Sequence, residues 1–267
     1  MLTRILSAVV ALPLFILLVF FAPEAVLMIA VALLNATACY EMLHTTGLVK
    51  SRLLLTVALI LAAAILPVTV YTGIDSALAI LFSGMCLLIT AVASRSTVDY
   101  REIFYAFLSA VFIPLALGSV FRLRMQEHGK ALVLLPFLAA WLTDTFAYFT
   151  GVFFGRHHIA PKISPKKTIE GCIGGTVLCT VVSLLYIPLA HAVFDVTIPA
   201  LPLALIMFTA SIISQFGDLS MSYIKRGASI KDYGKIMPGH GGVLDRFDSV
   251  LFSATVVEIW LYFINFV

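Results

Sequence analysis

The chain has 267 residues, of which 61% are hydrophobic and 12% are charged, and its mean hydropathy is +1.08. Soluble domains carry about 25% charged residues, so the composition excludes a soluble globular protein and indicates a polytopic integral membrane protein. The formal net charge is only +3. The positions of the charges therefore say more about the molecule than their sum.

Apolar runs near the roughly 20 residues needed to cross a hydrocarbon core recur along the chain. We expect an all-α fold with nine transmembrane helices, at residues 5–21, 26–40, 53–71, 76–94, 104–121, 131–155, 172–194, 198–217 and 249–267. The first run could pass for a signal peptide, but a chain that keeps crossing the membrane has no soluble domain to release. We interpret it as an uncleaved span. The second run is short and the sixth and eighth hold polar residues, so eight or ten spans are the alternatives.

The distribution of basic residues predicts the orientation in the membrane, because Lys and Arg accumulate in cytoplasmic loops. With nine spans and the N-terminus inside, the inside segments hold 14 of the 17 Lys and Arg residues. The outside loops hold only Arg122, Arg124 and Lys130. We therefore expect the N-terminus and two long basic segments, 156–171 and 225–248, on the cytoplasmic side.

The polar residues divide the chain into two functional parts. Residues 1–130 hold spans with short connections, and we expect them to serve packing and lipid access. Residues 131–267 hold both basic segments, each with Gly and Pro residues that break helices and let the backbone approach a ligand. We expect this second part to be catalytic.

Asp144 and Asp218 are acidic residues in or at the end of the apolar runs of the second part. Asp144 is inside the sixth run, and Asp218 is at the end of the eighth. A carboxylate at membrane depth is costly and usually faces a polar cavity. If the eighth run continues as a helix, Asp218, Ser222 and Lys225 share one of its faces. That stripe would combine an anion, a hydroxyl group and a cation.

Carboxylates beside clustered cations suit a magnesium ion and a polyphosphate. Asp245 and Asp248 stand three residues apart just before the last run, with Arg246 between them. Mg²⁺ takes one or two carboxylates plus phosphate oxygens, and Lys or Arg neutralises the remaining phosphate charge. His240, in the sequence PGHGG, could contact phosphate or transfer a proton. The pattern favours phosphoryl or nucleotidyl transfer, which relies on positioning and electrostatics.

Simpler interpretations stand beside this one. Basic loops next to a membrane commonly fix topology or bind anionic head groups. Asp245 and Arg246 could form an ordinary interfacial ion pair. We expect Glu41 at the end of a span rather than in a site, and Glu258, the acidic residue inside the last run, is given no role.

The order of residues from 222 to 248 is more specific than any residue alone. The stretch SYIKRGASIKDYGKIMPGHGGVLDRFD closely resembles the signature of the phosphatidate cytidylyltransferases, the CDP-diacylglycerol synthases of membrane lipid synthesis. The matching positions are Ser222, Lys225, Arg226, Lys231, Asp232, Gly234, Pro238, His240, Gly241, Gly242, Asp245, Arg246 and Asp248. Met237 stands where the family usually has Ile, Leu or Phe. Residues 144–171 resemble the family's second block.

The resemblance implies that CTP and phosphatidate react to give CDP-diacylglycerol and pyrophosphate, with Mg²⁺ as cofactor, expected as two ions. It implies metal ligation by Asp218 and Asp245, with Asp144 and Asp248 as further candidates, and catalytic roles for Asp218, Asp245, Lys225 and Arg226. The residues expected at the substrates are Ser164, Lys166, Lys167, Thr168, Ser222, Lys231, Asp232, His240, Gly241, Gly242 and Arg246.

The expected partners are the two substrates and membrane lipids, with no nucleic acid, and a homodimer is left open. We expect the protein in the inner (plasma) membrane with its active site facing the cytoplasm. Two other classes are weighed against this function. A CTP-dependent polyprenol or lipid kinase would need similar groups, but the DGxxAR core of CDP-alcohol phosphotransferases is missing. A divalent-cation or anion transporter would explain intramembrane Asp residues, but the paired repeats common in transporters are not seen in the sequence.

Overall fold

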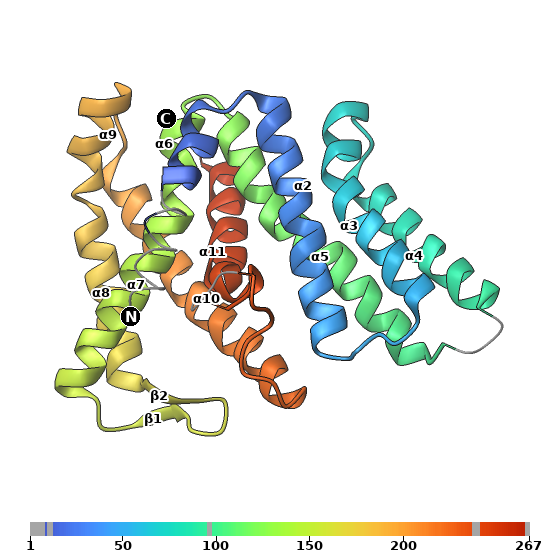
Figure 1. The fold of residues 1–267 in the computed structure, drawn as a ribbon. Coiled ribbons are helices and arrows are strands. Elements are labelled where there is room, and N and C mark those ends of the chain that lie inside the picture. Colours follow the sequence, from blue (N-terminus) through green and yellow to red (C-terminus); the bar gives the residue numbers. More distant parts are fainter. Residues whose placement is uncertain (1–8, 10–12, 95–97, 237–240, 265–267) are drawn as a thin grey trace. The chain divides into compact units, whose positions relative to one another are not determined.

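The computed structural model describes residues 9, 13–94, 98–236 and 241–264, and Figure 1 shows their elements along the chain. The helices, with η marking π-helices, are η1 (Leu17–Phe21), α2 (Glu24–Tyr40), η2 (Glu41–Thr45), α3 (Arg52–Thr72), α4 (Ser76–Ala93), α5 (Tyr100–Met125), α6 (Gly129–Leu132), α7 (Leu134–Phe154), α8 (Ile169–Ser183), α9 (Tyr186–Phe194), α10 (Ala200–Gly227) and α11 (Leu244–Phe263). Strands β1 (His158–Ala160) and β2 (Ser164–Thr168) pair as an antiparallel ribbon. The all-α prediction is confirmed.

Seven helical segments of the described chain are long and apolar enough to cross a membrane: Glu24–Thr45, Arg52–Thr72, Ser76–Ala93, Tyr100–Met125, Gly129–Phe154, Ile169–Phe194 and Ala200–Gly227. They correspond to the second to eighth expected spans, and the protein is an integral membrane protein. The first expected span begins in residues outside the described ones. The last corresponds to α11, whose charged residues keep it out of the seven. The count of nine and the orientation stay predictions.

The chain divides into two compact units. Residues 1–118 and 227–246 form the first unit, and residues 119–226 and 247–267 form the second. Helices α5 and α11, and the last residue of α10, therefore place residues of single helices in both units. The predicted division at residue 130 concerns function and stays a prediction.

Polar side chains fix the helix ends of the first unit, in which α2 packs on α3 and α3 on α4. Ser51 and Asp75 cap α3 and α4, because their side chains accept a backbone N–H from the first turn of each helix. The carboxylate of Glu102, on α5, accepts the N–H groups of Lys50 and Ser51 at 2.9 and 3.1 Å. The loop before α3 is thereby attached to α5.

Glycines allow α7 and α8 of the second unit to approach closely. A Cβ atom at Gly175 would lie 2.8 Å from the Cβ of Ala147 and 3.0 Å from the carbonyl oxygen of Thr143. A Cβ at Gly171 would lie 2.7 Å from the carbonyl oxygen of Ala147. Small residues bring helix backbones together where lipid offers little other driving force. This packing holds the ribbon, which leads into α8, against the end of α7.

An ion pair joins two helices at the other side of the second unit. Arg122, on α5, donates from its Nε to Glu258 Oε1 at 2.5 Å and from a terminal nitrogen to Glu258 Oε2 at 2.8 Å. This bidentate geometry is the strong form of an Arg–carboxylate pair. Glu258, which received no role from the sequence, thus attaches α11 to the end of α5.

Gly175→Ala is expected to destabilise the second unit, because the new methyl group cannot be placed without moving α7 away from α8. Overpacking of this kind costs about 1–3 kcal/mol, so the unfolding temperature of the detergent-solubilised protein should fall. Gly227→Ala is the control, since a Cβ there meets nothing within 4 Å. Equal unfolding temperatures for the two variants would contradict the packing argument.

Candidate active site

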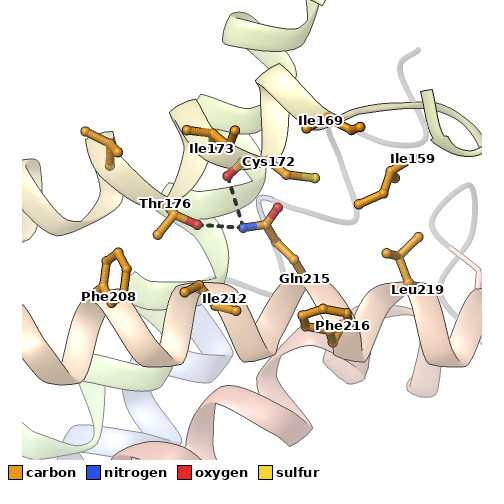
Figure 2. A pocket seen from close by; sticks show the side chains of 11 residues that line it. Ile159, Ile169, Cys172, Ile173, Thr176, Phe208, Ile212, Gln215, Phe216 and Leu219 are labelled. Atoms are coloured by element: carbon orange, nitrogen blue, oxygen red, sulfur yellow. Dashed lines mark hydrogen bonds between the residues drawn. The ribbon is translucent and has the colours of Figure 1, made fainter. Parts of the chain in front are cut away.

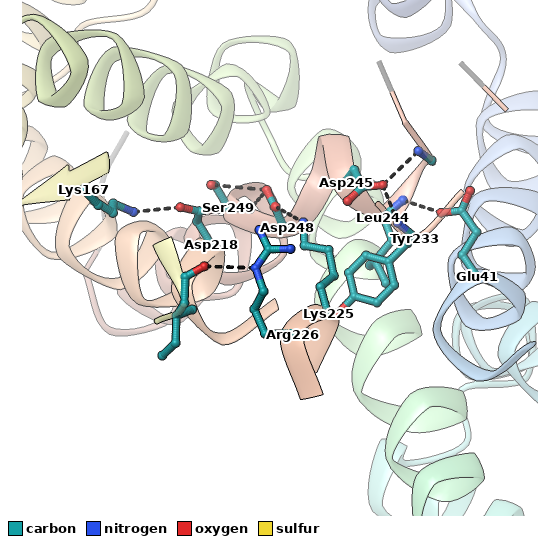
Figure 3. A network of polar contacts seen from close by, with 12 residues as sticks. Glu41, Lys167, Asp218, Lys225, Arg226, Tyr233, Leu244, Asp245, Asp248 and Ser249 are labelled. Carbon is teal, nitrogen blue, oxygen red and sulfur yellow. Dashed lines mark hydrogen bonds and ion pairs between the residues drawn. The ribbon is translucent and has the colours of Figure 1, made fainter. Parts of the chain in front are cut away.

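The first charged pair of the second unit connects the ribbon to α10. Lys167, on β2, donates from Nζ to Asp218 Oδ2 at 2.9 Å (Figure 3) and to the carbonyl oxygen of Gln215 at 3.4 Å. The Lys167 side chain is 12% exposed and that of Asp218 is 30% exposed. Neighbouring side chains on a strand point to opposite faces, and Lys166 is exposed. The structure therefore separates two lysines that the sequence treats alike.

A second pair joins the end of α10 to the start of α11. Lys225 Nζ lies 3.9 Å from Asp248 Oδ2, and the two side chains are 9% and 13% exposed. The other oxygen of Asp248 accepts the backbone N–H of Ser249 at 2.8 Å (Figure 3). Lysine is almost never this buried without an anionic partner. Lys225 and Asp218 lie on the single helix α10, as the predicted stripe requires.

A third carboxylate belongs to the same cluster. Asp144, on α7, interacts electrostatically with Asp218, and Asp218 interacts in turn with Asp248. Hard carboxylate oxygens are the ligands that Mg²⁺ prefers. The donor chemistry of the cluster therefore fits a magnesium ion.

The cluster does not form a complete metal cage by itself. Among the described residues, no group of three or more His, Cys, Asp and Glu side chains is placed to hold a metal ion. Mg²⁺ usually binds through one or two carboxylates and completes its coordination with waters and substrate phosphates. An ion here would accordingly be held together with a phosphorylated ligand.

Other predicted residues of the second unit lie around the ribbon. Thr168 is buried, and its hydroxyl oxygen accepts the Gly171 N–H at 3.2 Å, so it caps α8. Arg226 donates from Nε to the carbonyl oxygen of Ile163 at 3.3 Å, next to the ribbon. Ser164, on β2, and Ser222, on α10, are half-buried. The helix cap accounts for Thr168 without any ligand.

In the first unit, Asp245 organises the signature loop. It is 8% exposed, and its Oδ2 accepts the N–H of Tyr233 at 2.7 Å and that of Gly242 at 2.9 Å. Gly241 has a φ of +87°, a conformation that favours glycine. The N–H of Gly242 is thus bonded to Asp245, although we expected Gly241 and Gly242 to leave room for phosphate. The metal role of Asp245 stays a prediction.

The remaining predicted residues lie in the segment after α10 and at the start of α11. Lys231 and Asp232 are exposed in the segment after α10, and Arg246 is exposed on α11. His240 lies outside the described residues. Sequence reasoning missed Glu41, which is 1% exposed and bonded to the loop. No side-chain pattern marks it, because Glu41 follows the expected run 26–40 and its partners are backbone N–H groups.

An apolar pocket of about 350 Å³ lies in the second unit between α8 and α10 (Figure 2). Its wall includes Ile173, Phe208, Ile212, Phe216 and Leu219. Gln215 also lines it, and its Nε2 donates to the hydroxyl oxygen of Thr176 at 2.9 Å and to the carbonyl oxygen of Cys172 at 3.3 Å. The backbone carbonyl oxygen of Gln215 accepts a hydrogen bond from Lys167, so the pocket adjoins the first charged pair.

Several curated proteins that are similar to this chain share a name. A phosphatidate cytidylyltransferase of Bacillus subtilis is 36% identical over 193 residues, which are 72% of this chain and 69% of that protein. A phosphatidate cytidylyltransferase of Rickettsia prowazekii is 42% identical over 159 residues, or 59% of this chain and 70% of that protein. A phosphatidate cytidylyltransferase of Staphylococcus saprophyticus is 36% identical over 176 residues, which are 66% of this chain and 65% of that protein. The chain thus spans about two thirds of the length of these relatives.

A family model covers nearly the whole chain. The model described as the cytidylyltransferase family matches residues 2–264. That range includes the ribbon, both charged pairs and the loop held by Asp245. The chain belongs to the cytidylyltransferase family.

Proposed function

We propose that this protein is a phosphatidate cytidylyltransferase. A phosphate oxygen of phosphatidate attacks the α-phosphorus of CTP, and the bond from that phosphorus to the oxygen bridging to the β-phosphate breaks. CDP-diacylglycerol and pyrophosphate are the products. Because the nucleophile belongs to a substrate, no side-chain nucleophile is required. The protein has to hold two anionic substrates in line and offset their charge.

The observation that carries the proposal is the pairing of Lys167 with Asp218 and of Lys225 with Asp248. A complex of Mg²⁺ with a triphosphate carries charges of both signs. Its phosphate oxygens can accept hydrogen bonds from the lysines, and its cation can bind the carboxylates. When the complex binds, each lysine exchanges a carboxylate for phosphate and each carboxylate exchanges a lysine for Mg²⁺. No buried charge is then left without a partner, which would be costly. The name shared by the relatives supports the same reaction.

Two Mg²⁺ ions are part of the proposal, with Asp218, Asp248 and Asp144 as carboxylate ligands. Asp245 is retained as a predicted ligand, although its Oδ2 already accepts two backbone hydrogen bonds. Bound magnesium would withdraw charge from the phosphate groups and orient them. Lys225 and Arg226 would hold phosphate oxygens. Lys167 would exchange its contact with Asp218 for a contact with a substrate phosphate.

The apolar pocket supports a lipid as one of the two substrates. Its lining is aliphatic and aromatic, and it adjoins Lys167 through Gln215. An acyl chain would move there from equally apolar lipid, so the pocket would position the chain rather than add hydrophobic energy. We infer that a phosphatidate chain lies in the pocket with its phosphate toward Lys167.

The proposed location is the inner (plasma) membrane, with the site open to the cytoplasm, where CTP is available. The excess of Lys and Arg in the segments 156–171 and 225–248 supports this orientation.

Purified protein in detergent is expected to convert radiolabelled CTP and phosphatidate into a lipid-soluble cytidine product when Mg²⁺ is present. Asp218→Asn should lower this rate at least tenfold, on the order expected for loss of one charged ligand, because the amide keeps the shape but loses the charge. The control is Asp195→Asn, since Asp195 is exposed and its φ of +55° is tolerated by Asn. A wild-type protein that forms no labelled lipid would refute the proposed function. Near-normal rates for Asp218→Asn at unsaturating Mg²⁺ would remove this residue from the ligands.

Lys167→Ala is expected to reduce kcat/KM for CTP or phosphatidate by roughly 5- to 150-fold, the range of one charge-assisted hydrogen bond. Lys166→Ala should have the smaller effect, because Lys166 is exposed while Lys167 contacts Asp218. Steady-state kinetics on both variants measure the difference. If both variants keep wild-type kinetics and only their membrane orientation is mixed, the lysines serve topology.

The orientation predicts which loops an impermeant thiol reagent reaches in intact cells. In a variant without the four native cysteines, Asp195→Cys should be labelled from outside, whereas Lys162→Cys should be labelled only after the membrane is opened. Both positions are exposed in the structure. The reverse labelling pattern would mean that the spans were miscounted.

A further inference from the structure

Glu41 is a buried carboxylate that binds backbone rather than a cation. It is the first residue of the π-helix η2, and it is 1% exposed. Its Oε1 accepts the N–H of Val243 at 3.0 Å. Its Oε2 accepts the N–H of Leu244 at 2.8 Å, the contact that Figure 3 shows. All three residues belong to the first unit. π-helical turns are rare and are often found at functional sites.

These bonds place Glu41 as a cap for α11, supplied by a distant part of the chain. The first N–H groups of a helix have no partner inside it, and their positive end attracts carboxylates. Glu41 takes two N–H groups at the start of α11, while Asp245 takes those of Tyr233 and Gly242. Two carboxylates together therefore bind four backbone N–H groups, three at or just before the start of α11 and one in the segment after α10.

Two glycines of the signature are required by the same carboxylate. A Cβ atom at Gly234 would lie 2.3 Å from Glu41 Oε1, and one at Gly242 would lie 2.4 Å from it. No side chain other than hydrogen fits at these distances without moving Glu41 or the loop. The loop backbone is thus laid directly on the carboxylate, and these two glycines need no ligand to explain them.

We propose that Glu41 is a positioning residue for nucleotidyl transfer: it holds the signature loop in the conformation that sets Asp245 and Arg246 at the nucleotide. The proposal rests on the proposed function and on the predicted roles of Asp245 as a metal ligand and of Arg246 as a residue at the substrates. Glu41 acts through the backbone of the loop and contacts no substrate itself. Its effect should therefore be seen with CTP and Mg²⁺ and not with phosphatidate.

Glu41→Gln replaces one acceptor oxygen by an NH₂ group that faces a backbone donor. We expect kcat/KM for CTP to fall about tenfold or more, the effect of one lost hydrogen bond to a charged group, and the Mg²⁺ concentration for half-maximal rate to rise. The KM for phosphatidate should stay within about twofold, less than one such bond would change it. Glu24→Gln is the matched control, since Glu24 is exposed on the preceding helix α2.

A double-variant cycle separates this role from a phosphate contact by Gly242. In the wild-type background, Gly242→Ala places a methyl group against Glu41 and should reduce kcat/KM for CTP strongly. In the Glu41→Ala background the carboxylate is gone, so Gly242→Ala should cost less than about twofold more. If Gly242→Ala costs the same in both backgrounds, Gly242 serves a ligand and the proposal is overturned.

An unchanged kcat/KM for CTP and unchanged Mg²⁺ dependence in Glu41→Gln would also overturn the proposal, even if the unfolding temperature fell, because the residue would then be only structural. Should Glu41→Gln fail to fold, Glu41→Asp keeps the charge and is judged by the same kinetic split. Hydrogen exchange at the Val243 and Leu244 amides gives a readout that needs no activity. If these amides exchange faster in Glu41→Gln but the wild-type protein makes no labelled lipid, the contact of Glu41 with the backbone is confirmed. Only the proposed function is then refuted.

Discussion

The cost of placing a carboxylate among apolar helices governs this molecule. A charged group at membrane depth is expensive and needs a partner. The structure supplies partners of two kinds, which are cations for Asp218, Asp248 and Glu258, and backbone N–H groups for Glu41 and Asp245. The cationic partners of Asp218, Asp248 and Glu258 lie in the second unit, where Asp248 also accepts the Ser249 N–H, and the backbone donors to Glu41 and Asp245 lie in the first. The two kinds of pairing give the carboxylates different freedom to meet a substrate.

These contacts also join segments that are far apart in the sequence. Lys167 and Asp218 are 51 residues apart, Arg122 and Glu258 are 136 apart, and Glu41 and Leu244 are 203 apart. Apolar side chains discriminate poorly between helices in lipid, because the lipid is equally apolar. A directional bond to a charge has one correct partner. Within each unit the charged residues therefore specify which helices are neighbours, besides preparing the site.

The sequence predicted the apolar helices and the stripe on α10, because both depend on local periodicity. It could not distinguish Lys167 from Lys166, since the short ribbon that turns them to opposite faces has no apolar alternation. It also missed Glu41, whose partners are backbone donors about 200 residues later. No side-chain pattern marks a backbone N–H group. For the same reason Gly242 suggested space for a ligand, whereas the structure fills that space with a carboxylate.

The exposure of the carboxylates separates those that can exchange partners from those that cannot. The Asp218 side chain is 30% exposed, and its partner Lys167 is on a ribbon at the surface of the unit, so both can turn toward a metal–triphosphate complex. Glu41 and Asp245 are 1% and 8% exposed and each binds two backbone N–H groups, so releasing them would unmake the start of α11. Catalysis by positioning needs both behaviours. In the proposed function, the exchangeable pair would admit the charged substrate, and the fixed carboxylates would hold the backbone at the start of α11 during the reaction.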